Sequence, residues 1–103
     1  MGVLNKMDEI ERVRHYLEQL SDIKDKLNQV SAKLEELKVN NKIETKEYVR
    51  LYEKEFELSM SLSGIHGDIN ILLDKAATKD NSFVIKRLRQ EADKIFFPVY
   101  LEV

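Results

Sequence analysis

Apolar residues recur every three or four positions along the first third of the chain, the spacing of residues that share one face of an α-helix. The set is Ile10, Val13, Leu17, Leu20, Ile23, Leu27, Val30, Leu34 and Leu37. We predict one helix over about residues 5–38, roughly 50 Å long at a rise of about 1.5 Å per residue. Around Leu20 and Ile23, two three-residue steps follow one another, which locally overwinds a coiled coil.

A second periodic run fills the middle of the chain. Positions 48, 51, 55, 58, 62, 65, 69, 72 and 76 are apolar except for Glu55. The period continues without a slip through Gly64 and Gly67. We therefore predict one continuous helix over about residues 45–77. A kink at the two glycines, or two shorter helices broken there, is the alternative interpretation.

The segment between these runs carries the turn of a helical hairpin. Its asparagines tolerate left-handed backbone, and either Asn41 or Thr45 can cap the second helix. A hairpin that pivots near residue 41 would place residues 20–23 beside residues 59–62. We therefore expect the two helices to approach most closely there, beside the small residues Ser59, Ser61, Ser63, Gly64 and Gly67.

A third and shorter apolar run follows the turn-forming segment TKDNS. Its face is formed by Val84, Leu88, Ala92 and Ile95, and Pro98 ends it. This predicts a helix over about residues 82–96 and an extended apolar tail over 97–103. The fold class is all-α: residues 1–103 form one domain, a long antiparallel coiled-coil-like hairpin with a third helix at its open end.

The third helix is too short to cover the whole hairpin, and it leaves the turn end open. Tyr48, Tyr52 and Phe56 lie four residues apart there and form an aromatic ridge. We expect this ridge to bind a partner through apolar contacts. We expect the same of the tail residues Phe97, Tyr100 and Leu101. The tail, a second copy of the chain or a different protein could cover the ridge. A homo-oligomer, and a dimer in particular, is favoured.

Composition and charge narrow the possible partners. The 103 residues include 35% charged and 43% hydrophobic residues, no cysteine, and a net charge of −2. This balance provides no bulk attraction to nucleic acid or to an anionic membrane. The longest apolar run is far below the roughly 20 residues that span a bilayer. We expect a soluble, cytoplasmic protein without disulfides.

A row of basic residues supports an alternative function. Lys42, Lys46, Arg50 and Lys54 lie four residues apart and could follow the phosphates of a nucleic acid. Glutamates crowd this row, which favours a solvated, salt-bridged face. A small nucleic-acid-associated factor is therefore the second hypothesis for function.

Candidate chemistry is sparse. His15 and His66 are the only histidines. The predicted register points His15 away from the hairpin seam and places His66 beside it, so we expect two solvated side chains and no metal site. No phosphate-binding loop or nucleophile context is present. The sequence therefore predicts a non-catalytic assembly or adaptor protein without a cofactor, which acts through protein–protein contacts.

One short segment resembles a known binding motif. The stretch QEADKIFF is similar to the sliding-clamp-binding peptide in Gln90, Phe96 and Phe97. Asp93 stands at the position of the aliphatic residue of that motif. The resemblance covers eight residues, and packing at a helix end is the other interpretation.

Overall fold

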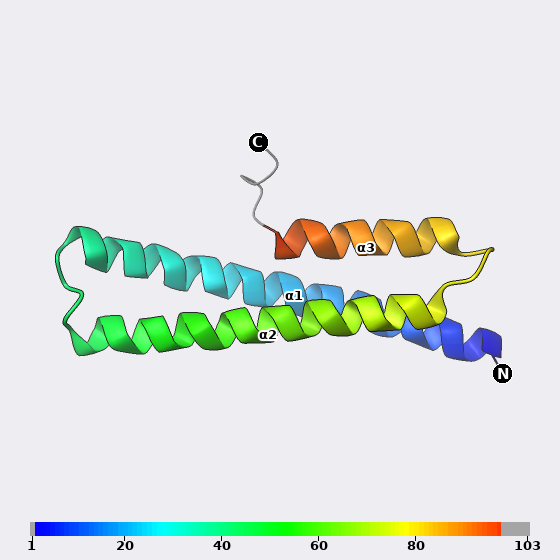
Figure 1. The fold of residues 1–103 in the computed structure, drawn as a ribbon, viewed down its shortest axis with the longest axis horizontal. Helices are drawn as coiled ribbons and strands as arrows, with labels where there is room; N and C mark the ends of the chain where they lie inside the picture. Colours follow the sequence, from blue (N-terminus) through cyan, green and yellow to red (C-terminus); the bar gives the residue numbers. More distant parts are fainter. Residues whose placement is uncertain (1, 98–103) are drawn as a thin grey trace.

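Three α-helices form the protein in a computed structural model that describes the backbone of residues 2–97 and the side chains of residues 8–97. Helix α1 spans Gly2–Val39, α2 spans Lys46–Ala76 and α3 spans Ser82–Phe96. The two long helices lie antiparallel, and α3 packs along the end of the hairpin that holds the N-terminus (Figure 1). The shape is elongated, with extents of 58 × 30 × 15 Å. The predicted all-α hairpin with a shorter third helix is confirmed.

The connection between α1 and α2 holds the C-terminal cap of the first helix and the N-cap of the second. Asn41 adopts the left-handed conformation with φ 61°, and the Lys42 N–H donates to the Leu37 carbonyl at 2.8 Å. This is the Schellman arrangement, which satisfies carbonyls at a helix C-terminus. The Thr45 hydroxyl then accepts from the Tyr48 N–H at 3.2 Å and caps α2. Of the two predicted caps, Thr45 is therefore the one used.

The register of the hairpin differs from the predicted one by about one helical turn. The Ser31 hydroxyl donates to a Glu55 carboxylate oxygen at 2.8 Å, whereas a pivot at residue 41 would place residue 51 opposite Ser31. The connection spans residues 40–45, so the pivot lies later than predicted. The bond gives Glu55, the charged exception in the apolar pattern, a hydrogen-bond partner inside the hairpin.

Helix α2 is continuous through Gly64 and Gly67, as predicted. The expected close approach beside them is wrong. A Cβ atom added at either glycine would meet no heavy atom within 4 Å. The reason is rotational: Leu62 and Ile69 are buried, and Gly64 and Gly67 lie two residues from them, about 200° around the helix. The glycines therefore lie away from the buried face, and their serine neighbours Ser59, Ser61 and Ser63 are exposed.

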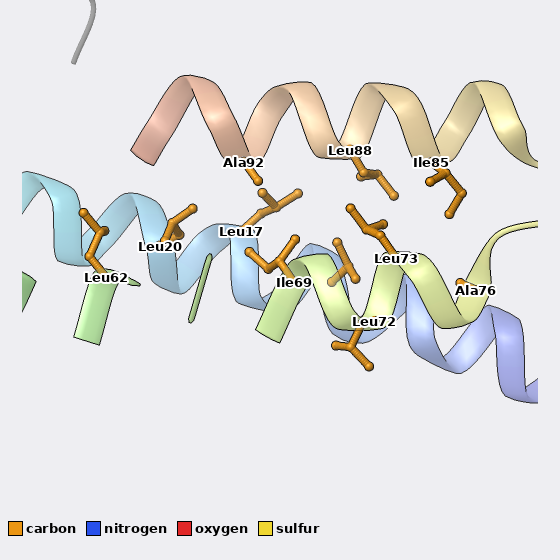
Figure 2. Packing of buried hydrophobic residues seen from close by; sticks show 11 residues of the cluster. Leu17, Leu20, Leu62, Ile69, Leu72, Leu73, Ala76, Ile85, Leu88 and Ala92 are labelled. Carbon is orange, nitrogen blue, oxygen red and sulfur yellow. The ribbon is translucent and has the colours of Figure 1, made fainter. Parts of the chain in front are cut away.

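The hydrophobic core is concentrated where three helices meet. Its fully buried large side chains are Val13, Leu20, Ile69 and Leu73. Figure 2 shows Ile85, Leu88 and Ala92 of α3 pointing toward the two long helices. Toward the turn, only α1 and α2 remain (Figure 1), and the buried side chains there are Leu34, Leu37 and Leu58. We refer to these parts as the three-helix half and the two-helix half.

Candidate interaction surface

Helix α2 carries apolar side chains on two opposite faces. One face packs into the core through residues such as Leu58, Leu62 and Ile69. On the other, Val49 is 52% exposed, Phe56 63%, Met60 62% and Ile71 55%. Val49, Met60 and Ile71 are each 11 residues apart, about three full turns, so they share one line along the helix. An amphipathic helix normally has one apolar face, so this second face marks a surface of α2 that the other described residues leave open.

The middle of this face is nearly bare of side chains. Gly67 follows Phe56 by 11 residues and therefore lies on the same line. Gly64 and Ser63 flank it, and space is open beyond both glycines. We call the set Val49, Phe56, Met60, Ser63, Gly64, Gly67 and Ile71 the outer stripe. It is bulky toward the turn, flat beyond Met60, and bulky again at Ile71.

The predicted aromatic ridge lies partly on the outer stripe. Tyr52 is 58% exposed and Phe56 is on the stripe itself. Tyr48 is half-buried, and its ring stacks on Tyr52 with centroids 6.4 Å apart. Each step of four residues turns about 40° around a helix, so the ridge winds outward from Tyr48 to Phe56. The three aromatic residues therefore form a curved edge, with Tyr52 and Phe56 accessible to a partner.

The structure does not bring Phe97 to this ridge. Its ring lies at the end of α3, edge-on to Phe96 with centroids 5.1 Å apart and to His66 at 6.0 Å. His66 follows Phe56 by ten residues, about 15 Å along α2. Tyr100 and Leu101, the other predicted anchors, lie outside the described residues. Phe97 is half-exposed and forms a separate apolar site.

A polar seam between α2 and α3 was missed by the sequence reasoning. The His66 Nε2 atom lies 2.9 Å from an Asp93 carboxylate oxygen. The Arg89 guanidinium donates to Asn70 at 2.8 Å and to Asp74 at 2.9 Å. Both sets step by four residues, so they form a ladder along the two antiparallel helices. This spacing, present on both helices, was the signal in the sequence that could have revealed the pairing.

The prediction of a solvated His66 is wrong. Its side chain is only 14% exposed, and its ring stacks on Phe96 with centroids 4.2 Å apart and an interplanar angle of 11°. The end of α3 covers it, a contact that the register of the hairpin alone could not indicate. Because Phe96 is used in this contact, the packing interpretation of the QEADKIFF segment fits the structure. His15 is exposed, as expected.

Exposed charges of both signs lie along α2, because Glu47, Glu53 and Glu57 stand among the cations of its N-terminal half and Lys75 stands beside Asp74. Lys46 and Arg50 are exposed near its N-terminus, and Asp68 and Asp74 are exposed nearer its C-terminus. The Asp74 side chain is 75% exposed although it accepts from Arg89. Of the predicted basic row, Lys42 lies in the turn before α2, so the helical part comprises Lys46, Arg50 and Lys54.

The described side chains include no group of three or more His, Cys, Asp or Glu residues placed to hold a metal ion. Within residues 2–97, no helix is long and apolar enough to cross a membrane. Comparisons of the chain with protein-family models, curated proteins and solved structures find no match.

Proposed function

We propose that this protein is a non-catalytic helical assembly or adaptor protein that acts through protein–protein contacts, with a second copy of the chain as its partner. The observation that carries this proposal is the second apolar face of α2. Phe56 and Met60 are more than 60% exposed in the centre of a long helix. Contiguous exposed apolar side chains of this kind are typical of interaction sites, whereas single ones are ordinary.

The energy available from this face favours modest affinity. Full burial of a large apolar side chain gives about 1.5–3 kcal/mol, and Val49, Phe56, Met60 and Ile71 are each 52–63% exposed. Covering all four in both copies therefore gives on the order of 8 kcal/mol. Loss of translational and rotational freedom costs at least about 4 kcal/mol. The difference of about 4 kcal/mol corresponds to a dissociation constant of about 1 mM, so we expect weak self-association.

Light scattering coupled to size-exclusion chromatography tests the proposal over a concentration series. The expected mass rises from the 12.1 kDa of one chain toward twice that value. Tyr52→Glu should return the mass to that of one chain without loss of helicity, because a buried carboxylate without a partner is costly. Phe83→Glu is the matched control, since Phe83 is 71% exposed but belongs to α3.

Two results would contradict self-association. One is a mass of 12.1 kDa at every concentration that the protein tolerates. The other is equal loss of association in the Tyr52→Glu and Phe83→Glu variants, which would show a general effect of added charge. A stable monomer that binds a different protein through Tyr52 would retain the adaptor role and exclude the second copy as partner.

The nucleic-acid hypothesis depends on the exposed cations Lys46, Arg50 and Lys54 along one side of α2. The net charge of −2 and the neighbouring glutamates weaken it. Retention on DNA or RNA at physiological salt would support this alternative. Lys46→Glu with Arg50→Glu should then abolish retention, and unchanged retention would eliminate the basic row as the binding site.

A further inference from the structure

We propose that residues 98–103 fold back along the two-helix half and cover Tyr52 and Phe56 of their own chain. We call these six residues the C-terminal segment; they lie outside the described residues. Three observations lead to this occupant: the side of α2 that carries the aromatic ridge, the place where α3 ends, and the apolar pattern of the segment. The docking stands by itself, and only its effect on self-association rests on the proposed function.

The ridge lies on the side of α2 to which α3 binds. His66 and Asn70 hold α3 through Asp93 and Arg89. Tyr52 precedes Asn70 by 18 residues, which is five full turns of a straight helix. With the 3.5-residue period of a coiled coil, Tyr52 instead lies in line with His66, which is 14 residues further along the chain. Either period places Tyr52 on the α3 side, beyond the end of α3.

Helix α3 ends before it reaches the ridge, and the chain leaves it in an extended conformation. Asp93 faces His66 across two antiparallel helices, so Phe97, four residues later, stands opposite Leu62. The backbone of Phe97 is extended, with φ −88° and ψ 137°. A proline follows Phe97, and it cannot continue the helix. Tyr52 lies ten residues from Leu62, about 15 Å along α2.

The C-terminal segment has the length and the pattern to cover that distance. Six extended residues span about 20 Å at roughly 3.3 Å each, which is more than the distance to Tyr52. Alternate side chains of an extended segment share one face. Val99, Leu101 and Val103 therefore share a face that is entirely apolar, and Glu102 belongs to the other. One face can pack on the ridge while the carboxylate stays in water.

The connection to α3 favours this segment over a second copy. A binding group on a short linker acts at an effective concentration on the order of millimolar. The dissociation constant expected for the dimer is about 1 mM, so at micromolar concentrations a second copy occupies the ridge less often than the attached segment. Charge does not select between these occupants, because exposed cations and carboxylates alternate along this half of α2. Self-association through Tyr52 then requires release of the segment.

Paramagnetic relaxation enhancement locates the segment in the full chain. The chain has no cysteine, so Glu102→Cys provides a unique site for a nitroxide label. We expect the Tyr52 amide signal to be broadened much more than that of Ile71. Ile71 is the control because it lies nine residues from Leu62 in the opposite direction along α2. Equal broadening of the two amides overturns the docking.

A mixture of chains shows which copy holds the segment. Spin-labelled chains without an isotope label are mixed with isotope-labelled chains without a spin label. Docking within one chain predicts no broadening of Tyr52 in the mixture at micromolar concentration. Broadening there as strong as in the chain that carries both labels would show that the segment binds a second copy, and would overturn docking within the chain.

Substitutions in the segment test its apolar face and its effect on association. Val99→Ser with Leu101→Ser and Val103→Ser should remove the preferential broadening of Tyr52. Tyr100→Ser is the matched control on the other face and should retain it. If the segment covers about two thirds of the ridges, both copies must release it, so the triple variant should self-associate about tenfold more tightly. Equal effects of the triple variant and Tyr100→Ser would overturn the proposed face.

The failure of this inference differs from the failure of the proposed function. A chain that stays monomeric at every concentration, also as the triple variant, but shows preferential broadening of Tyr52 keeps the docking and refutes self-association. A dimer whose Tyr52 and Ile71 amides broaden equally keeps self-association and refutes the docking. A triple variant that loses the broadening without tighter association refutes the regulatory effect alone.

Discussion

Replacing the two glycines of α2 by alanine should stabilise the single chain, because no contact among the described residues requires a glycine there. Both lie in the interior of α2, neither has a positive φ, and an added Cβ would meet no atom within 4 Å. Glycine in a helix interior is about 0.8–1 kcal/mol less favourable than alanine. Gly64→Ala with Gly67→Ala should therefore raise the free energy of unfolding by about 1.5–2 kcal/mol.

This gain is large enough to measure by thermal unfolding. For a domain of this size, 1 kcal/mol shifts the melting temperature by roughly 4–8 °C, so the double variant should melt about 10 °C higher. The measurement is made by circular dichroism in dilute solution, where the chain is monomeric and association adds nothing. Ala32→Gly on the exposed face of α1 is the reverse control, expected to cost about 1 kcal/mol.

A specific outcome would refute the reasoning. If the double variant were no more stable than the parent while Ala32→Gly lost stability as expected, something must approach the glycines in the single chain.

Two further substitutions test the core and the polar seam. Leu73 is fully buried where three helices meet, so Leu73→Ala should lower the free energy of unfolding by about 3–4 kcal/mol, against about 2 for Leu34→Ala. Equal losses in urea titrations would contradict the uneven core. A double-mutant cycle between His66→Ala and Asp93→Ala should give a coupling of about 0.5–1 kcal/mol. Zero coupling would show that stacking on Phe96 alone positions His66.

The helices could be predicted from the sequence because one physical rule sets them. Apolar side chains must share a face, and the period of an α-helix converts this requirement into spacing. The predicted boundaries of the second helix, about 45–77, and of the third, about 82–96, agree with Lys46–Ala76 and Ser82–Phe96 within one residue. Thr45 marks the start of α2 by its own hydrogen bond to the backbone, which explains the accuracy there.

The register could not be predicted because it depends on the conformation of a few turn residues. The left-handed Asn41 ends the Schellman motif, and the chain then needs several more residues before Thr45 can cap α2. A shift of four residues in the register between α1 and α2 leaves the apolar pattern of each helix unchanged. The register therefore cannot be derived from periodicity. The link between His66 and Asp93 depends in the same way on the loop before α3, whose path the sequence leaves open.

The role of the glycines was misjudged for a different reason. The apolar period had already assigned Leu62 and Ile69 to the core face, and the same rotation of about 100° per residue places Gly67 on the far side. Small residues suggested close packing, but the face they occupy decides which helix can approach. The signal for an outward surface was therefore present in the sequence, in Met60 and Ile71 at 11-residue spacing.

The uneven core and the exposed apolar face belong to one arrangement. Helix α3 covers only the N-terminal end of the hairpin (Figure 1), and the fully buried large side chains, Leu20 among them, lie in that half. Val49 and Phe56 are exposed in the two-helix half, where the core is thin. Segments with few buried apolar contacts open at lower free energy than the rest of a domain. A partner bound along Phe56 would bury apolar surface in the two-helix half, where the core is smallest. Binding of such a partner would therefore stabilise this half.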